Sequence, residues 1–298
     1  CYYATVDNIN MLKADFALWM YAAQKGGDSY LTMAGEALDA VTRTPLLGKF
    51  ADVFDVKNKA NKEIAFALHV DATNEVHSAS YIQRFIWGST QVKASYNVEG
   101  GVPVSSNQWF CYADEFIGEL KRNKEQNNDQ RSDVTYMERT GVSDMYEKVG
   151  WPNKFTGDWS SGTLLYDDDL ILYRYAQYYM FRAELYYYRK QYKEALGELN
   201  VVAQRAYGKA DFYTSATQQD VLEALAAENR WEFAEEGNLW FTYIRLGYID
   251  TYCPLKYWPN TGVEGGVGGS TNPNIYLFPI STSAINKNSN LRQTEGWS

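Results

Sequence analysis

The sequence predicts a mainly α-helical protein whose helices pair into hairpins, with long irregular loops and few short strands between them. Two observations predict this class. Apolar residues recur at spacings of three and four in two separate pairs of segments, as they do on amphipathic helices. Between these pairs, residues 88–166 are rich in Gly, Ser, Asn and Asp and carry aromatic residues without any period. A chain of 298 residues is long enough to bury a full apolar core.

The first pair of helices is predicted within residues 1–45. Residues 5–24 carry apolar residues at helical spacing, namely Ile9, Leu12, Phe16, Trp19 and Met20. Gly26 and Gly27 end this helix, and residues 30–41 predict a second one. The two segments together predict a helical hairpin.

The segment that follows has less regular character. Residues 63–70 and 81–87 are short apolar runs, and periodicity does not decide between a strand and a buried segment. Within the loop-rich region, only residues 112–122 predict a helix. The polar run at residues 122–133 is interpreted as a solvated turn. Because loops this long are uncommon in compact domains and are usually functional or disordered, residues 88–166 are the candidate functional region, and the family resemblance given below implies that they form the ligand face.

A second hairpin is predicted from residues 170–188 and 192–207. Like the first, it has a helix with small residues, a short turn, and then Tyr followed by Ala and Leu. Small residues let paired helices approach closely, which is typical of tetratricopeptide-like hairpins. The two hairpins therefore predict a helical scaffold that is interrupted by the loop-rich region.

A further long helix is predicted to begin at Thr217, which can cap it, and to continue through Trp240. One face of this helix carries Leu222, Leu225, Ala226, Phe233, Gly237 and Trp240. Residues 262–269 predict a flexible glycine-rich loop, and residues 276–297 an extended, turn-rich ending.

Composition excludes several classes of protein. The net charge of −9 argues against a nucleic-acid partner, because phosphate backbones select basic surfaces. No apolar run is long enough to span a bilayer, and no signal peptide is present. Three widely spaced cysteines, Cys1, Cys111 and Cys253, exclude a disulfide scaffold and give no zinc spacing.

No catalytic constellation stands out, so no catalytic residue, metal ligand or cofactor is predicted. His69 and His77 lie in no metal-binding motif and are interpreted as structural. Residues 167–169 are three aspartates; a calcium site is conceivable, but capping of the next helix is the preferred interpretation.

Four carboxylates close together in the sequence suggest a glycosidase pair, namely Glu228, Glu232, Glu235 and Glu236. Three of them fall on one side of a single helix rather than on opposing walls of a cleft. Structural ion pairing is therefore favoured, with Arg230 and Arg245 as nearby partners.

Aromatic residues make up 16% of the chain, and their positions predict the binding site. A flat ring in a polar loop can stack on the C–H face of a sugar, while neighbouring polar groups bind its hydroxyls. The predicted ligand-binding residues are the loop aromatics Trp87, Tyr96, Trp109, Tyr112, Trp151 and Trp159.

Three segments carry a resemblance to a known family. They are YRYAQYYMFRAELYYYRKQYKEALGELNVV at residues 173–202, ENRWEFAEEGNLWFTYIRLG at 228–247 and YLFPISTSAINKNSNLRQTEGW at 276–297. In this order they resemble the SusD/RagB family of outer-membrane nutrient-binding lipoproteins, found beside TonB-dependent transporters in Bacteroidetes. Asp129-Gln130-Arg131 also stands where that family often has Asp-Pro-Arg.

The resemblance implies a single SusD-like domain over residues 1–298, with the family-signature region at 170–298. Because members of that family are typically longer, the chain resembles their C-terminal part. Cys1 is then not the lipid-bearing residue, and membrane attachment is expected only through an N-terminal lipid outside this chain.

By the same resemblance, the implied function is non-catalytic capture of an oligo- or polysaccharide at the cell surface and its delivery to a SusC-like TonB-dependent transporter. Three alternatives stay open: a glycan-cleaving hydrolase, a peptide-binding member of the family, and a helical-repeat adaptor. The sequence does not name the sugar or its linkage.

Overall fold

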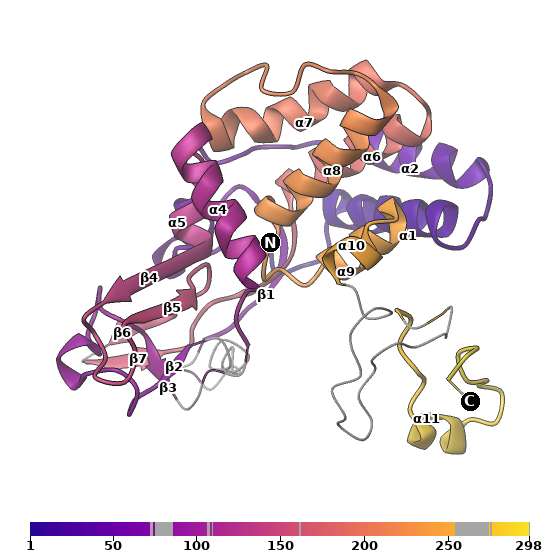
Figure 1. Ribbon diagram of the computed structural model, residues 1–298. Coiled ribbons are helices and arrows are strands. Elements are labelled where there is room, and N and C mark those ends of the chain that lie inside the picture. Colours follow the sequence, from indigo (N-terminus) through magenta and orange to yellow (C-terminus); the bar gives the residue numbers. More distant parts are fainter. Residues whose placement is uncertain are drawn as a thin grey trace. The chain divides into compact units, whose positions relative to one another are not determined.

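The computed structural model describes residues 1–71, 74, 86–105, 108, 110–160, 162–253, 274 and 276–297. The chain forms two compact units, Cys1–Gly237 and Asn238–Ser298, and each is described by itself. Helices dominate and the strands are short, which confirms the predicted class (Figure 1). Within the described ranges, no helix is both long and apolar enough to cross a membrane.

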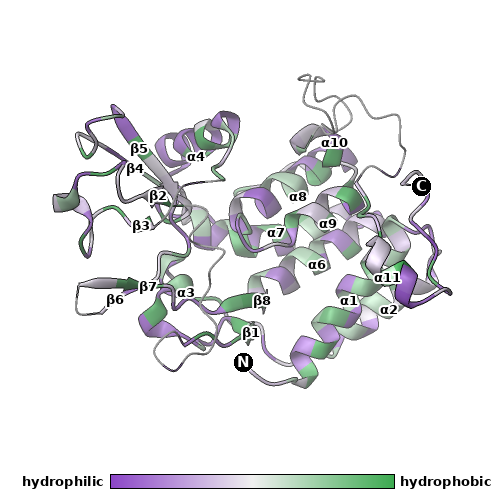
Figure 2. Cartoon of the chain, turned by 90° about the horizontal axis from the view of Figure 1, so that it is seen from below, coloured by the Kyte–Doolittle hydropathy of each residue, from purple (hydrophilic) through white to green (hydrophobic). Residues whose placement is uncertain are grey.

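The predicted first hairpin is present as α1 (Val6–Ala22) and α2 (Ser29–Asp39). Thr5 caps α1 through a capping box: its hydroxyl accepts from the Asn8 backbone N–H at 3.3 Å, and the Asn8 side chain accepts from the Thr5 N–H at 2.8 Å. Hydrophobic residues recur along α1 (green in Figure 2). Four alanines, Ala14 and Ala17 of α1 and Ala34 and Ala37 of α2, lie in a shared core with Phe181 and Leu185.

Three of the five apolar residues whose spacing predicted α1 are exposed. Ile9, Leu12 and Phe16 are 54%, 55% and 51% exposed. The buried face instead carries Met11, Ala14, Ala17 and Leu18. Both faces are apolar, and the one with small side chains lets α2 approach α1 closely, so it enters the core. Periodicity alone does not choose between two such faces.

The second hairpin consists of α6 (Tyr175–Tyr188) and α7 (Tyr192–Tyr207). Of the two helices, α6 begins five residues later than the predicted start at residue 170. The missing residues form strand β8 (Leu170–Arg174), which pairs antiparallel with β1 (Ile64–Leu68). β1 and β8 are more than one hundred residues apart in the sequence. The hydrophobic periodicity of one segment carries no information about a pairing partner so far away. The pairing also settles residues 63–70 as a strand.

The three aspartates before β8 do not cap a helix, which corrects that interpretation. Asp169 accepts hydrogen bonds from the Val70 backbone N–H at 3.0 Å and from the Tyr2 hydroxyl at 2.6 Å. Asp168 accepts from the Gly157 N–H at 2.7 Å. Because β8 separates them from α6, their carboxylates instead bind backbone and side-chain groups of distant segments, such as the Lys59 ammonium group at Asp167. Among the described residues, no cluster of three or more His, Cys, Asp or Glu could hold a metal ion.

The predicted long helix from Thr217 through Trp240 is two helices. Thr217 caps α8 (Gln218–Glu232) as expected, and α9 (Leu239–Leu246) follows after a break. Glu235 and Gly237 in the break have φ of 67° and 81°. This left-handed backbone cannot continue a right-handed helix, and the break is also where the two units meet in sequence.

The loop-rich region contains more regular structure than predicted. Its elements are η3 (Ala94–Tyr96), α4 (Asp114–Asn127), α5 (Ser132–Thr135), and the strands β2 (Trp87–Gly88), β3 (Val104–Ser105), β4 (Tyr136–Thr140), β5 (Lys148–Pro152), β6 (Asp158–Ser160) and β7 (Thr163–Leu165). β4 pairs with β5 and β6 with β7, both antiparallel, and β2 pairs with β3 in parallel. Trp151 and six surrounding aliphatic residues form a separate core here.

The polar run at residues 122–133 is not a solvated turn. Its first half continues α4 to Asn127, where Asn128 in the left-handed region ends the helix. Asp129 and Arg131 are then buried, at 3% and 0% exposure. A polar sequence reads as exposed unless its charges find buried partners, and here they do.

Before the loop-rich region, α3 (Ala51–Phe54) and η1 (Val56–Asn58) form one short turn of structure. In the second unit, α9 and α10 (Ile249–Tyr252) share a core with Tyr276, and α11 (Thr282–Lys287) follows. The Trp240 indole N–H donates to the Tyr276 carbonyl oxygen at 2.9 Å. The predicted glycine-rich loop at 262–269 lies outside the described residues, as do residues 81–85 and His77.

Candidate binding groove and the ion network behind it

A buried network of ion pairs crosses the first unit and involves three of the four glutamates discussed above. Arg131 binds Asp129 at 2.9 Å, Glu228 at 2.7 Å and Glu232 at 3.2 Å. Every one of these side chains is 0% exposed. The hydroxyls of Tyr207 and Tyr213 each donate to Glu228 at 2.7 Å.

The network continues through Arg174, the residue that joins β8 to α6. Arg174 binds Glu63 at 3.0 Å, Glu232 at 2.5 Å and Glu236 at 2.7 Å. Arg205 on α7 bridges Glu63 and Glu232 as well. Glu232 thus lies among three guanidinium groups, which come from the loop after α4, from β8 and from α7.

The pKa values follow from these contacts. Burial alone would lower the pKa of the Arg131 guanidinium, but Glu228 and Asp129 hold it well above its ordinary value. Burial would raise the pKa of Glu232, but Arg205, Arg174 and Arg131 hold it well below its usual range. Both groups therefore stay charged at all physiological pH values.

The preferred interpretation of the glutamates as ion-pairing residues is confirmed for Glu228, Glu232 and Glu236. Their partners, however, are arginines distant in sequence rather than Arg230 and Arg245; Arg230 binds Glu119 at 3.2 Å. Glu235 differs, because burial raises its pKa to about 8. None of the four lines either of the hollows described next.

The candidate site is a groove made of two adjoining hollows in the loop-rich region. The first, here the Arg139 hollow, has a volume of about 230 Å³. It is lined by Val98, Gly100, Gly101, Pro103, Met137, Arg139, Trp151, Asn153, Thr156, Gly157 and Trp159.

The second, here the Asp55 hollow, has a volume of about 440 Å³. It is lined by Ala51, Asp52, Phe54, Asp55, Val56, Lys57, Glu99, Asp133, Val134, Asn153, Lys154, Thr156, Gly157, Asp158 and Trp159. Asn153, Thr156, Gly157 and Trp159 belong to both hollows, so the two form one groove, here called the Trp159 groove.

The ion network positions the segment shared by both hollows. Lys154 is 2% exposed; its ammonium group binds Glu236 at 2.9 Å and donates to the Glu232 carbonyl oxygen at 3.0 Å. The adjacent Asn153 donates from its amide side chain to the Asp133 carbonyl oxygen and accepts from the Trp151 indole N–H at 3.0 Å. Residues 153–159 are therefore anchored from the core side.

Gly157 forms the turn that leads into β6, which begins at the next residue. Its φ of 73° is in the left-handed region, and its N–H is the group that donates to Asp168. Burial raises the pKa of Asp168 to about 7. Trp159, two residues on, lies on β6 opposite Leu164 of β7 and is half-buried.

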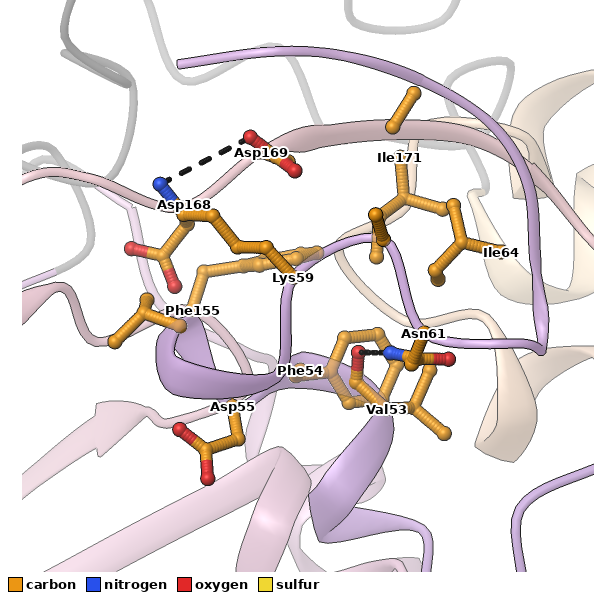
Figure 3. A pocket seen from close by; sticks show the side chains of 13 residues that line it. Val53, Phe54, Asp55, Lys59, Asn61, Ile64, Phe155, Asp168, Asp169 and Ile171 are labelled. Carbon is orange, nitrogen blue, oxygen red and sulfur yellow. Dashed lines mark hydrogen bonds and ion pairs between the residues drawn. The ribbon is translucent and has the colours of Figure 1, made fainter. Parts of the chain in front are cut away.

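A small cavity next to the Asp55 hollow is lined in part by the carboxyl group of Asp168. It has a volume of about 20 Å³, and Asp168, Asp169 and Lys59 lie on its lining with Phe54 and Phe155 (Figure 3). Asp168 Oδ1 has no hydrogen-bond partner among the described residues. A space of this size accommodates one water molecule, which could satisfy that oxygen.

The predicted aromatic residues do not form one cluster. Trp159 lines both hollows and is the one best placed for stacking. Trp151 is 2% exposed in the core of the region, so its ring faces are covered and its prediction as a stacking residue is corrected: it supports the wall of the groove. On β5 every residue from Val149 to Pro152 is buried, so Trp151 lies in a stretch of strand that is covered on both faces.

Of the other four predicted residues, the three that the structure describes are not on the lining of either hollow. Trp87 is half-buried, donates to the Gly150 carbonyl oxygen at 2.7 Å and packs on Tyr146. Tyr112 packs on Phe116 and Tyr136, and burial raises the pKa of its hydroxyl well above the ordinary value. Tyr96 is 37% exposed and begins the loop that supplies Val98 and Gly100. Trp109 lies outside the described residues.

Sequence reasoning missed most polar residues of the groove. Arg139 extends from β4 and donates to the Gly100 carbonyl oxygen at 2.8 Å. Asp52 and Asp55 come from the turn before β1, which the sequence left unassigned. Isolated charged residues give no periodic signal, and only their meeting in space marks them.

Comparison with known proteins now places the fold. The model of the SusD family matches residues 87–297. The starch-binding protein SusD of Bacteroides thetaiotaomicron is 30% identical over 161 residues, which are 53% of this chain and 27% of that protein.

Solved structures agree. A SusD superfamily protein from Bacteroides fragilis matches with a TM-score of 0.73 at 22% identity. The matched region is 100% of this chain and 66% of the Bacteroides fragilis protein. Surface glycan-binding protein A from Bacteroides thetaiotaomicron, in complex with laminarihexaose, has a TM-score of 0.67 at 18% identity, with 97% and 64% covered. The chain thus spans less than two thirds of these relatives, and the likeness concerns the fold.

Proposed function

The chain belongs to the SusD family, and on this premise we propose that it binds a glycan without cleaving it and passes it to a TonB-dependent transporter. The glycan-binding names of its relatives, starch for one and laminarihexaose for another, support a saccharide as ligand. The proposed location is the outer-membrane surface, with a lipid anchor on the full-length protein. A SusC-like barrel is the proposed partner.

The observation that carries the proposal is the Trp159 groove. It combines one half-buried indole at the junction of two hollows with amide, hydroxyl and charged groups on the walls. An apolar ring beside polar groups is the pairing that a sugar ring needs, because its C–H face and its hydroxyls point in different directions. Trp159 is the proposed stacking residue and Asn153 a proposed hydroxyl partner, while Tyr96 and Trp87 stay secondary candidates.

Absence of turnover is part of the proposal. Glu228, Glu232 and Glu236 are held in ion pairs within the core, away from the lining of the groove. A glycosidase needs two carboxyl groups on either side of the bond, one of them able to donate a proton. Glu232, whose pKa the three arginines hold well below its usual range, cannot donate that proton, and none of the three glutamates lines the groove.

The test is glycan binding by Trp159→Ala. Stacking is worth about 0.5–1.5 kcal/mol, so affinity should fall about threefold to tenfold without being abolished. Phe16→Ala is the matched control, because Phe16 is an aromatic residue 51% exposed on α1, outside the groove. Unchanged affinity of Trp159→Ala on every bound glycan would refute the site.

A reducing-end assay tests the hydrolase alternative. Incubation of the protein with each bound polysaccharide should release no new reducing ends. Release that depends on a single Asp or Glu would establish a hydrolase instead.

A further inference from the structure

Charge is unevenly distributed along the Trp159 groove. The Asp55 hollow is lined by five carboxylates, those of Asp52, Asp55, Glu99, Asp133 and Asp158, and by two ammonium groups, those of Lys57 and Lys154. The Arg139 hollow has one charged side chain, Arg139 itself, on its lining. The two ends of one groove therefore present different electrostatic surroundings to a ligand.

The two lysines do not offset this excess of negative charge for a ligand. Lys57 lies 3.8 Å from Glu99 and 3.9 Å from Asp158, so its single charge is shared between two acids. Lys154 is buried and bound to Glu236, which does not line the hollow. Asp133 has its own partner outside the lining, Lys124 at 2.6 Å.

Glu99 and Asp133 are exposed but are in ion pairs with lysines, which leaves Asp52 and Asp55 as the exposed acids of this hollow without such a partner among the described residues. The Asp55 carboxylate accepts from the Lys57 backbone N–H at 2.8 Å, which fixes its position at the start of η1 without neutralising it. Neither acid forms an ion pair in the described part of the chain. A ligand group in the Asp55 hollow thus meets at least two uncompensated negative charges.

We propose that the groove selects saccharides by charge: the Asp55 hollow accepts uncharged or amine-bearing sugar units and excludes uronate, sialate or sulfate groups. The inference rests on the proposed function of the groove and adds a substrate class to it. Two unit charges 4 Å apart repel by about 1 kcal/mol even in bulk water, which is about fivefold in affinity. Two acids should therefore lower the affinity for an anionic sugar unit by at least about tenfold at low salt, and the reduction should be smaller at high salt.

A glycan array tests the class with the full 298-residue chain. The array carries neutral hexasaccharides (laminarihexaose, cellohexaose and maltohexaose), a chitosan hexasaccharide, an oligogalacturonate and sulfated oligosaccharides. Binding confined to neutral and amine-bearing glycans is the expected result. Preferred binding of the carboxylated or sulfated members would overturn the inference while leaving glycan binding intact. If the protein binds no glycan at all, the proposed function itself fails.

A second measurement identifies the residues responsible. For the neutral glycan bound best, its C6-oxidised uronate form is compared with the unmodified form by calorimetry at low and high salt. The uronate should bind at least about tenfold more weakly at low salt, and the double variant Asp52→Asn, Asp55→Asn should remove most of that difference. Asn keeps the acceptor that binds the Lys57 N–H. The double variant Asp28→Asn, Asp39→Asn, at the two ends of α2 and outside the groove, removes the same number of charges and should leave the ratio unchanged.

Two outcomes of this measurement count against the inference. Equal affinity of the neutral and uronate forms means that the hollow does not sense charge. A ratio that persists in the Asp52→Asn, Asp55→Asn variant, or that the Asp28→Asn, Asp39→Asn control changes equally, means that the general acidity of the chain rather than these residues causes it.

Discussion

Replacing Arg131 with Met should destabilise the first unit strongly, although no ligand contact is lost. Arg131 is 0% exposed and binds three carboxylates, of which Asp129 and Glu228 are its nearest partners. Met fills much of the volume but leaves both carboxylates in the core with no guanidinium beside them. Removing one partner of a buried ion pair typically costs about 3–5 kcal/mol, because the other charge remains desolvated.

The assay is urea unfolding followed by far-UV circular dichroism, with the free energy of unfolding extrapolated to water. Lys121→Met is the matched control: Lys121 binds Glu138 at 2.9 Å, but the side chains are 45% and 29% exposed. An exposed pair of this kind is worth at most about 1 kcal/mol. Arg131→Met should therefore lower the free energy of unfolding several times more than Lys121→Met does.

The pH dependence separates lost charge pairing from lost packing. In Arg131→Met the unpaired Asp129 and Glu228 acquire raised pKa values in the folded state, so protonation relieves the penalty. The variant should therefore lose more stability at pH 8 than at pH 5. A loss below about 1 kcal/mol, or one equal at both pH values, would refute the reasoning.

Two further predictions concern Gly157, which lines both hollows, and Asp168, which accepts a hydrogen bond from the Gly157 N–H. Asp168 has a folded-state pKa of about 7 against an ordinary 3.8, so the folded protein holds its proton more tightly and the wild type loses stability as pH rises from about 4 to 7. Asp168→Asn should remove that loss, gaining up to roughly 4 kcal/mol on the wild type by pH 8; parallel pH profiles of unfolding free energy would contradict this. Gly157→Ala should cost more stability than Gly141→Ala and should also weaken glycan binding. Both glycines have φ above 70°, but only at Gly157 would the new Cβ clash with a backbone atom, the Leu165 carbonyl oxygen; equal losses in thermal unfolding would exclude that clash.

Local patterns predicted the hairpins well. α1 with α2 and α6 with α7 follow from apolar spacing and from glycines or short turns, which are properties of a few neighbouring residues. Thr217 likewise predicted the start of α8. The family followed from three ordered motifs, and the match over residues 87–297 confirms it.

Local patterns failed where a distant partner decides. The apolar residues at 170–174 are compatible with the start of a buried helix, but they form β8 because they pair with β1. Ile9 and Leu12 look like core residues, yet the alanine face of α1 packs more closely and is buried instead.

For the candidate site, sequence patterns alone predicted a region, residues 88–166, and a kind of residue, an aromatic ring in a polar segment. The structure places one of those aromatics, Trp159, on the lining of both hollows, and its role in binding stays a prediction. Tertiary structure decided that Trp151 is a core residue and that Arg131, in a polar run, is the centre of buried ion pairs. Spacing encodes which residues share a face of one element, whereas burial and charge pairing depend on what other elements bring to that face.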